Sequence, residues 1–286
     1  MAQKPSVSIG GMMTAHKIEK FNEYLKQIGS GLVALSGGVD SAVLLLLASR
    51  CREFRVKAAT VLAAAHPPDE SDAARKLAAD LNVAHLEVPL DLLRQPEIRA
   101  NGPDRCYHCK RHIYSILLDL AREHALDAVL DGSNADDSPL ERPGSRAIRE
   151  LGVRTPLSDV GLGKEEIREI ARRYGLPMWN KPATACVFTR IPAGEVLEQG
   201  RLKRVVMAEN RLRGMGFPAV RVRDHGDTAR IEVPVDFMES MIAAATQTDM
   251  VRELKGLGYR FVTLDLSGYR SGSMNHPAAD GCIEDP

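Results

Sequence analysis

Short apolar runs alternate with amphipathic stretches from residue 31 to about residue 178, and this alternation limits the folds open to the chain. Runs of this length are typical of buried strands, and they lie at 31–36, 56–65, 83–88 and 127–132. The stretches between them repeat apolar residues at helical spacing, and a further amphipathic helix is expected at 164–175, where a glycine ends it. Strand and helix in alternation predict βαβ units, so we expect an α/β fold with a doubly wound parallel sheet.

The pattern changes after Cys186. Helices are expected at 200–217 and 235–257, and strands at 219–225, 228–234 and 260–266. This order predicts a smaller C-terminal α+β domain that contains an antiparallel pair. We therefore expect a flexible tail at 1–14, the α/β domain at 15–185, a domain for substrate binding or oligomerisation at 186–275, and a second tail at 276–286.

Charge and cysteine content narrow the class of protein. The 38 basic and 38 acidic residues cancel, which disfavours nucleic acid as a partner. The longest apolar run, at 42–49, is too short to span a membrane, and the N-terminus has no signal-peptide pattern. An odd number of cysteines, five, points to the reducing cytoplasm. Metal or catalytic roles for cysteine are then favoured over disulfides.

Residues 36–41 read S-G-G-V-D-S, directly after a predicted strand and at the start of a predicted helix. Gly37 and Gly38 allow a tight turn whose N–H groups can approach an anion, next to the positive end of the helix. Ser36 and Ser41 add hydroxyl groups, and Asp40 can hold Mg²⁺ against phosphate oxygens. The simpler alternative is a tight strand-to-helix turn with a serine cap.

The longer stretch ALSGGVDSAVLL resembles the pyrophosphate loop of the PP-loop ATP pyrophosphatases. That resemblance implies an enzyme that splits ATP between its α- and β-phosphates and adenylates an acceptor oxygen. The segment LDGSNADD follows a later strand, at the edge where α/β sheets bind ligands. Asp131, Asn134 and Asp136 are candidates for a role there.

Three cysteines have unusual surroundings. Cys106 and Cys109 form a C-x-x-C pair in DRCYHCKRH, and Cys186 stands 77 positions beyond Cys109. Three thiolates can hold a 4Fe-4S cluster and leave one iron open for an extra sulfide. A zinc site completed by His108 or His112, unrelated buried thiols, and a Cys186 that gives up its own sulfur remain alternatives. Spacing does not separate the cluster from zinc. Cys51 and Cys282 are interpreted as structural or incidental.

The segments 179–195, 216–234 and 258–275 resemble the sulfurtransferases that build the nickel-pincer nucleotide of lactate racemase. The resemblance implies a nucleotide-like small-molecule substrate, pyridinium biscarboxylic acid mononucleotide, whose carboxylates become thiocarboxylates. One kind of member sacrifices a single cysteine, which aligns with Ala185 here, and the other kind carries three cysteines and a 4Fe-4S cluster. Cys106, Cys109 and Cys186 match the second kind.

The same resemblance implies roles for polar residues. It places Lys110, Thr189, Arg221 and Arg223 near the substrate phosphate, and it makes Glu209 a possible metal ligand. Without it, Arg221 and Arg223 would be interpreted as solvated strand residues and Glu209 as a helix-surface charge.

The expected cofactors are ATP, Mg²⁺ and the cluster, with sulfide or a sulfur-relay protein as donor, and the expected assembly is a homo-oligomer. Two rivals remain open. One is a PP-loop enzyme of tRNA thiolation, which the zero net charge disfavours. The other is a non-catalytic zinc- or nucleotide-binding module.

Overall fold

The computed structural model describes residues 9–63, 68–137, 143–180 and 185–269. Contacts between Cα atoms divide these residues into two compact units. The first unit holds 9–63, 68–90 and 106–180, and the second holds 91–105 and 185–269. Segment 91–105, which the sequence placed inside the first domain, thus packs with the C-terminal part of the chain.

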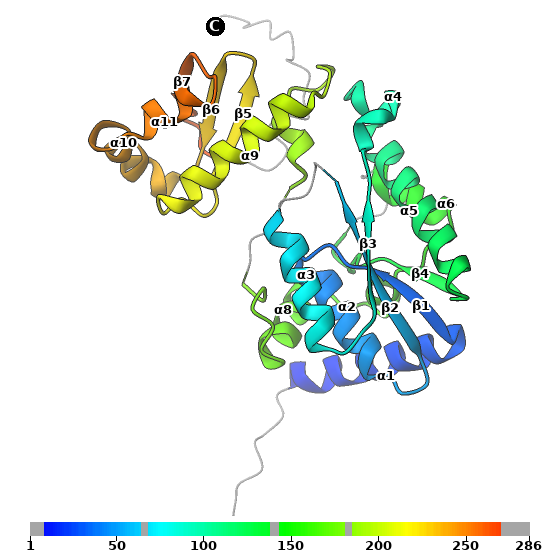
Figure 1. Ribbon diagram of the computed structural model, residues 1–286. Coiled ribbons are helices and arrows are strands. Elements are labelled where there is room, and N and C mark those ends of the chain that lie inside the picture. Colours follow the sequence, from blue (N-terminus) through cyan, green and yellow to red (C-terminus); the bar gives the residue numbers. More distant parts are fainter. Residues whose placement is uncertain (1–8, 64–67, 138–142, 181–184, 270–286) are drawn as a thin grey trace, which may run out of the picture. The chain divides into compact units, whose positions relative to one another are not determined.

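The first unit is built on a parallel sheet of four strands, β1 (Ser30–Ala34), β2 (Arg55–Leu62), β3 (His85–Pro89) and β4 (Ala128–Leu130). Their order is β3-β2-β1-β4, with Gly31 of β1 opposite Val56 of β2 and Ala128 of β4. Helices cover both faces of this sheet (Figure 1). The predicted doubly wound parallel sheet is confirmed.

Alternate side chains of β1 enter two different cores. Val33 packs with α1 (Ile9–Ile28), α2 (Val39–Arg50), α3 (Pro68–Asp80) and α8 (Lys164–Arg173). Leu32 packs on the other face with α5 (Arg105–Glu123) and α6 (Pro143–Glu150). Helix α2 buries nine of its twelve residues, which explains why its sequence is apolar all round. The sheet is therefore enclosed on both sides, as parallel sheets usually are.

The N-terminal helix corrects one prediction. Helix α1 already begins at Ile9, so the expected tail does not extend to residue 14. Lys17 donates to Glu166 Oε2 (2.6 Å) and to the Gly161 carbonyl (2.7 Å). Burial acts to raise the pKa of the Glu166 carboxyl, but the hydrogen bond from Lys17 and the Gly163 N–H bring it below its usual range. This pairing ties α1 to the start of α8 across a long stretch of chain.

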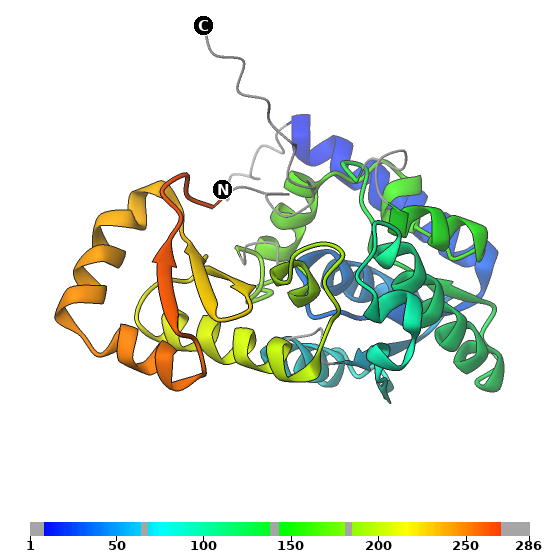
Figure 2. The same ribbon diagram turned by 90° about the horizontal axis from the view of Figure 1, so that it is seen from above.

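The second unit contains a sheet of three strands, β5 (Arg221–His225), β6 (Thr228–Glu232) and β7 (Phe261–Leu264). Strands β5 and β6 are antiparallel, as predicted, and β7 pairs parallel to β6. One apolar core joins this sheet to helices α9 (Gln199–Gly214), α10 (Met238–Gln247) and α11 (Met250–Gly256). Figure 2 shows the sheet and these helices from above. The shorter elements are η1 (Leu92–Arg94), α4 (Pro96–Arg99), α7 (Pro156–Asp159), η2 (Val187–Arg190) and η3 (Val235–Phe237).

The single helix expected at 235–257 is wrong, because Thr248 interrupts it. Its backbone is extended (φ −129°, ψ 174°). Its Oγ1 donates to the Ala244 carbonyl (2.7 Å) and accepts from the Met250 N–H (3.2 Å). The threonine side chain thus closes α10 and opens α11, which is the usual competition of short polar side chains with helical hydrogen bonds.

Segment 91–105 is attached to the second unit by hydrogen bonds from its backbone and from a buried amide. The Gly194 N–H donates to the Asn101 carbonyl (2.9 Å), and the Leu197 N–H donates to the Arg99 carbonyl (2.8 Å). Asn101 Nδ2 donates to the Pro192 carbonyl (2.8 Å). Hydrogen-bond partners this far apart along the chain produce no local sequence pattern, so the sequence did not predict that segment 91–105 packs with the second unit.

No helix in the described part of the chain is long and apolar enough to cross a membrane.

Asp224 on β5 is a fully buried charge of the second unit, with an exposed fraction of 0%. Its carboxylate pairs with Arg201 (2.8 Å) and Arg204 (2.5 Å), and it accepts from Tyr259 Oη (3.1 Å) and the Gly226 N–H (3.1 Å). Removing one partner from such a buried network leaves a charge uncompensated and lowers the stability of the fold. Removing an exposed carboxylate costs little stability.

We predict that Asp224→Ala lowers the free energy of unfolding by about 3–5 kcal/mol, because two half-buried arginines lose their fully buried counter-charge. Urea unfolding followed by circular dichroism measures this. The matched control is Asp227→Ala at an exposed position two residues from the strand end, with an expected change within about 0.5 kcal/mol. Equal losses in the two variants would contradict the assignment of Asp224 as the anchor.

Candidate functional site

The S-G-G-V-D-S loop lies between β1 and α2 and is ordered by its own serines. Ser41 Oγ accepts from the Ser36 N–H (3.1 Å), lies 3.1 Å from Ser36 Oγ, and donates to the Gly38 carbonyl (3.2 Å). Gly37 has a left-handed backbone (φ +78°), and a Cβ there would lie 2.3 Å from the Glu70 carbonyl oxygen. Glycine is therefore required at this position by both conformation and space.

Asp40, in the first turn of α2, presents two different carboxylate oxygens. Its Oδ2 pairs with Lys164 Nζ. Its Oδ1 is buried and accepts no hydrogen bond within the described residues. A buried carboxylate oxygen without a donor is the kind of ligand that Mg²⁺ takes, so the residue fits the expected magnesium.

Lys164 is a site residue that the sequence analysis missed. It opens α8, and its backbone N–H donates to Asp136 Oδ2 (2.6 Å), while the Asp136 N–H donates to Asn134 Oδ1 (2.9 Å). The structure thus brings Asp136 and Asn134 together with the lysine that holds Asp40. The available signal was a lysine directly after the G-L-G turn at 161–163, at the start of an amphipathic helix.

Asp131 follows β4 and forms the other side of this edge. It is 6% exposed, and it accepts from Tyr114 Oη, Lys110 Nζ (3.3 Å) and the Ser133 N–H (2.8 Å). Burial acts to raise the pKa of Asp131, but the charge of Lys110 and the Ser133 hydrogen bonds hold it below its usual range. Lys110, expected near the substrate phosphate, is thus paired with a carboxylate of the first unit.

The chain after Asp131 packs directly on the S-G-G-V-D-S loop. A Cβ on Gly132 would lie 2.9 Å from the Ser41 backbone nitrogen. Strands β1 and β4 are parallel neighbours, so both loops leave the sheet at its carboxyl edge. The site predicted at that edge stays a prediction, and the structure places both loops there.

The cysteine pair lies at the start of α5, within its first five residues. Cys106 and Cys109 are three residues apart on a helix, so they share one side of it. Cys106 is exposed and Cys109 is half-buried. They belong to the first unit, whereas the exposed Cys186, just before η2, belongs to the second.

Within the described residues, no three His, Cys, Asp or Glu side chains are grouped as a metal site. Cys51 is buried at the end of α2, as expected of a structural thiol. Cys282 lies outside the described residues.

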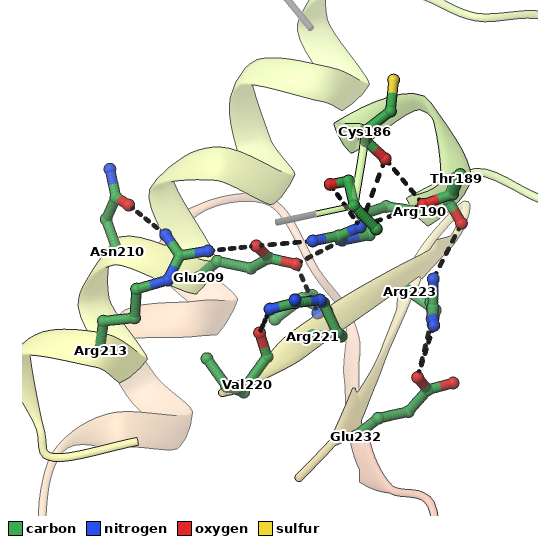
Figure 3. Close-up of polar contacts among 12 residues, drawn as sticks. Cys186, Thr189, Arg190, Glu209, Asn210, Arg213, Val220, Arg221, Arg223 and Glu232 are labelled. Atoms are coloured by element: carbon green, nitrogen blue, oxygen red, sulfur yellow. Dashed lines mark hydrogen bonds and ion pairs between the residues drawn. The ribbon is translucent and has the colours of Figure 1, made fainter. Parts of the chain in front are cut away.

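Arg221 and Arg223 lie on β5, as shown in Figure 3, and are 5% and 4% exposed, so their interpretation as solvated residues is wrong. Arg223 donates to Glu232 Oε2 (2.7 and 2.9 Å) and to the Thr189 carbonyl (3.0 Å). Arg221 donates to the Val220 carbonyl (2.9 Å). Burial, and then repulsion by Arg190, lower the pKa of Arg221, and a bound anion would relieve both effects.

Glu209 on α9 is 3% exposed, so it is not the surface charge that its helix position alone suggested. Oε1 accepts from Arg190 Nε (2.6 Å) and the Val222 N–H (3.1 Å), and Oε2 accepts from Arg190 Nη2 (3.3 Å) and Arg213 Nη2 (2.6 Å) (Figure 3). A carboxylate enclosed by two guanidinium groups does not fit a divalent cation. The structure therefore disagrees with Glu209 as a metal ligand.

A four-stranded parallel sheet, a glycine loop after its first strand and an oriented carboxylate at the start of the next helix define a nucleotide-binding α/β protein of the PP-loop class. The family model for asparagine synthase matches residues 31–137, which contain that loop.

Relatives extend the likeness over most of the chain. Pyridinium-3,5-bisthiocarboxylic acid mononucleotide synthase of Lactiplantibacillus plantarum is 38% identical over 252 residues, 88% of this chain and 91% of that protein. An uncharacterized protein of Synechocystis sp. is 35% identical over 92% of this chain and 98% of its own length. A tRNA-specific 2-thiouridylase of Pelobacter propionicus is 30% identical over 52% of this chain and 51% of that enzyme. The chain belongs to the PP-loop ATP pyrophosphatases, in the family of the bisthiocarboxylic acid mononucleotide synthase.

We predict that Lys110→Met lowers stability at neutral pH and reduces the loss of stability that acid causes in the wild type. A carboxyl whose pKa is depressed in the folded state adds stability above its unfolded pKa of about 4, and this contribution is lost as the pH falls. Without Lys110, burial raises the folded-state pKa of Asp131 above its unfolded value, so the variant should be destabilised near neutral pH, and this deficit should shrink as the pH falls and the carboxyl is protonated.

Urea unfolding midpoints between pH 3 and pH 8 measure the effect. Lys110→Arg keeps the cation and is expected to follow the wild-type profile. Identical profiles for Lys110→Met and the wild type would contradict the Asp131 pairing.

Proposed function

We propose that this protein is an ATP-dependent sulfurtransferase that converts the carboxylates of pyridinium biscarboxylic acid mononucleotide into thiocarboxylates for nickel-pincer nucleotide synthesis. The observation that carries the proposal is the ordered S-G-G-V-D-S loop with Asp40 Oδ1 left without a donor among the described residues. Similarity to a thiocarboxylate-forming synthase over 88% of the chain supports the choice of substrate.

The loop at 36–41 is the proposed site for the pyrophosphate part of ATP. Its N–H groups and the start of α2 favour negative charge, and Ser36 and Ser41 supply hydroxyl donors. Asp40 Oδ1 would hold Mg²⁺, which neutralises phosphate charge. Lys164 already faces this carboxylate, so its ammonium group is available to a phosphate oxygen that replaces Asp40 Oδ2.

The reaction has two steps. A substrate carboxylate oxygen attacks the α-phosphorus, the bond to the bridging oxygen breaks, and pyrophosphate leaves. Hydrosulfide then attacks the acyl carbon of the adenylate, and AMP leaves with its bonding electron pair. Activation is needed because oxide is a poor leaving group, and covalent activation divides one difficult substitution into two easier ones.

The three cysteines are the proposed sulfur-handling residues. Their donor set, three thiolates, suits a 4Fe-4S cluster, which would supply sulfide for transfer. Cys106 and Cys109 share one side of α5 at its start, and Cys106 and Cys186 are exposed. The rival zinc site and the sacrificial Cys186 use the same residues and are separated by experiment.

The second unit is proposed to hold the substrate phosphate. Arg221 is a buried cation whose pKa is lowered by burial and by Arg190, so an anion at this position would be stabilised. Thr189, which donates to the Cys186 carbonyl, and Arg223, which donates to the Thr189 carbonyl, are the other members of the expected set in this unit. Lys110, the fourth member, belongs to the first unit. The expected homo-oligomer stays a prediction.

We predict that Asp40→Asn lowers substrate-dependent pyrophosphate release by at least about a hundredfold, the scale for losing one electrostatic contact to a transition state. Asparagine has almost the same shape, so the fold should survive. Labelled pyrophosphate release measures the rate, and Asp80→Asn on the exposed end of α3 is the matched control. A wild-type rate in Asp40→Asn would contradict the assignment of the loop.

We predict that Cys106→Ala, Cys109→Ala and Cys186→Ala each lose iron, labile sulfide and sulfur transfer, yet keep adenylation. A cluster held by three thiolates loses its hold when any one is removed. Anaerobic purification with iron and sulfide analysis measures this, and Cys51→Ala is the control.

The rivals give different results. A sacrificial Cys186 would become about 34 Da lighter after one turnover, the mass of lost H₂S. A zinc site would give colourless protein with one zinc. Full activity in anaerobic protein without iron would overturn the cluster.

A further inference from the structure

The turn that carries Cys186 is held from inside by one buried arginine. Arg190 is 1% exposed. Its Nη1 donates to the carbonyl oxygens of Ala185 (3.2 Å) and Cys186 (3.3 Å) and to Thr189 Oγ1 (3.0 Å). A guanidinium group offers five donors in a rigid planar fork, so one side chain can fix several acceptors at once.

The other edge of the same guanidinium is fixed by Glu209. Arg190 Nε and Nη2 meet the two carboxylate oxygens at 2.6 and 3.3 Å. Glu209 is itself held by the Val222 N–H of β5 and by Arg213 one helical turn along α9. The position of Arg190 is therefore set by α9 and β5, the two packed elements beside the turn.

The Cys186 backbone receives further donors. The Thr189 N–H (3.0 Å) and Thr189 Oγ1 (2.7 Å) both donate to the Cys186 carbonyl oxygen, which also accepts from Arg190. The sulfur atom points away from this network (Figure 3). The backbone of Cys186 is thus fixed on one side while its thiol is directed to the other.

We propose that Arg190, anchored by Glu209, is a positioning residue that sets the direction of the Cys186 thiol. In this relay the Glu209 carboxylate orients the guanidinium, and the guanidinium holds the carbonyls of Ala185 and Cys186. Glu209 acts as the anchor of an arginine and not as a metal ligand. The inference rests on the sulfur-handling role proposed for Cys186, but its structural content does not depend on iron.

A buried ion pair of this kind is a poor source of stability, because removing two charges from water costs about as much as their attraction returns. Its value lies in geometry. Arg190 is satisfied by Glu209 and by backbone carbonyls, and Glu209 is satisfied by Arg190, by Arg213 and by the Val222 N–H. Positioning of the turn is what the pair supplies.

The test is hydrogen exchange of the full-length protein prepared without iron, read by mass spectrometry with fragmentation across residues 185–192. Glu209→Gln keeps the size of the side chain and removes its charge, and Arg190→Lys keeps the charge and removes the fork. In both variants the Thr189 amide, which donates to the Cys186 carbonyl, is expected to exchange at least about tenfold faster.

Arg213→Met is the matched control. Arg213 pairs with the same carboxylate (2.6 Å) and with Asn210 (2.7 Å), on the side of Glu209 away from the turn (Figure 3). Its loss should leave exchange at Thr189 within about twofold of the wild type, although it removes a comparable ion pair. Faster exchange in Arg213→Met equal to that in Glu209→Gln would show general loosening and would overturn the relay.

Two further arms complete the test. The double variant Arg190→Lys with Glu209→Gln should exchange the Thr189 amide little faster than either single variant, because both changes break the same relay. Fully additive effects on exchange would overturn the relay. Manganese binding, followed by its paramagnetic resonance, is expected to be equal in wild type and Glu209→Gln. Loss of bound manganese in Glu209→Gln, with unchanged exchange at Thr189, would make Glu209 a metal ligand and overturn the proposal.

The outcomes separate this inference from the proposed function. If both variants speed exchange of the Thr189 amide non-additively, but the protein never binds iron, the relay is supported and the cluster is rejected. An iron-loaded protein with unchanged exchange in both variants keeps the cluster and rejects the relay. If Arg190→Lys does not fold, Glu209→Gln and Arg213→Met still decide between the two roles.

Discussion

The loop at residues 36–41 depends on two places where backbone meets backbone with no side chain between. A Cβ on Gly37 would lie 2.3 Å from the Glu70 carbonyl oxygen, and a Cβ on Gly132 would lie 2.9 Å from the Ser41 nitrogen. The first close approach packs the loop against the start of α3, and the second packs it against the residues that follow β4. A loop already held from two sides loses less conformational entropy when a phosphate binds, which is the physical advantage of preorganisation.

The second unit follows a different principle, since buried carboxylates organise it. Asp224, Glu209 and Glu232 are nearly inaccessible to solvent, and each pairs with two arginines. Breaking such groups is costly, but replacing them by apolar residues of equal size is often neutral, so their role is to specify geometry. Two of these arginines, Arg190 and Arg223, donate to backbone carbonyls of the Cys186 turn. Arg204 donates to the Gly226 carbonyl in the hairpin turn between β5 and β6.

How much the sequence could predict depended on the distance between partners along the chain. Strand β1 and the loop after it were found because an apolar run and a glycine pair are local signals. The part of α1 before residue 15 was missed because the partner of Thr14 there is Glu166, 152 residues away along the chain. The break at Thr248 had a local signal, since a threonine followed by an aspartate favours a cap over a helix interior. Lys164 and Arg190 were missed because a pair such as Lys164 and Asp40 leaves no periodic trace.

Carrying a residue's role from one family member to another requires its neighbours as well as its identity. The resemblance offered Glu209 as an isolated carboxylate, and an isolated carboxylate on a helix is a reasonable metal ligand. In this chain a guanidinium nitrogen lies 2.6 Å from each of its two oxygens, so a cation that binds the carboxylate would have to compete with two positive charges. Metal binding would require the arginines to give up these contacts to a buried carboxylate, which is costly. The charge of Glu209 is therefore already used in the fold.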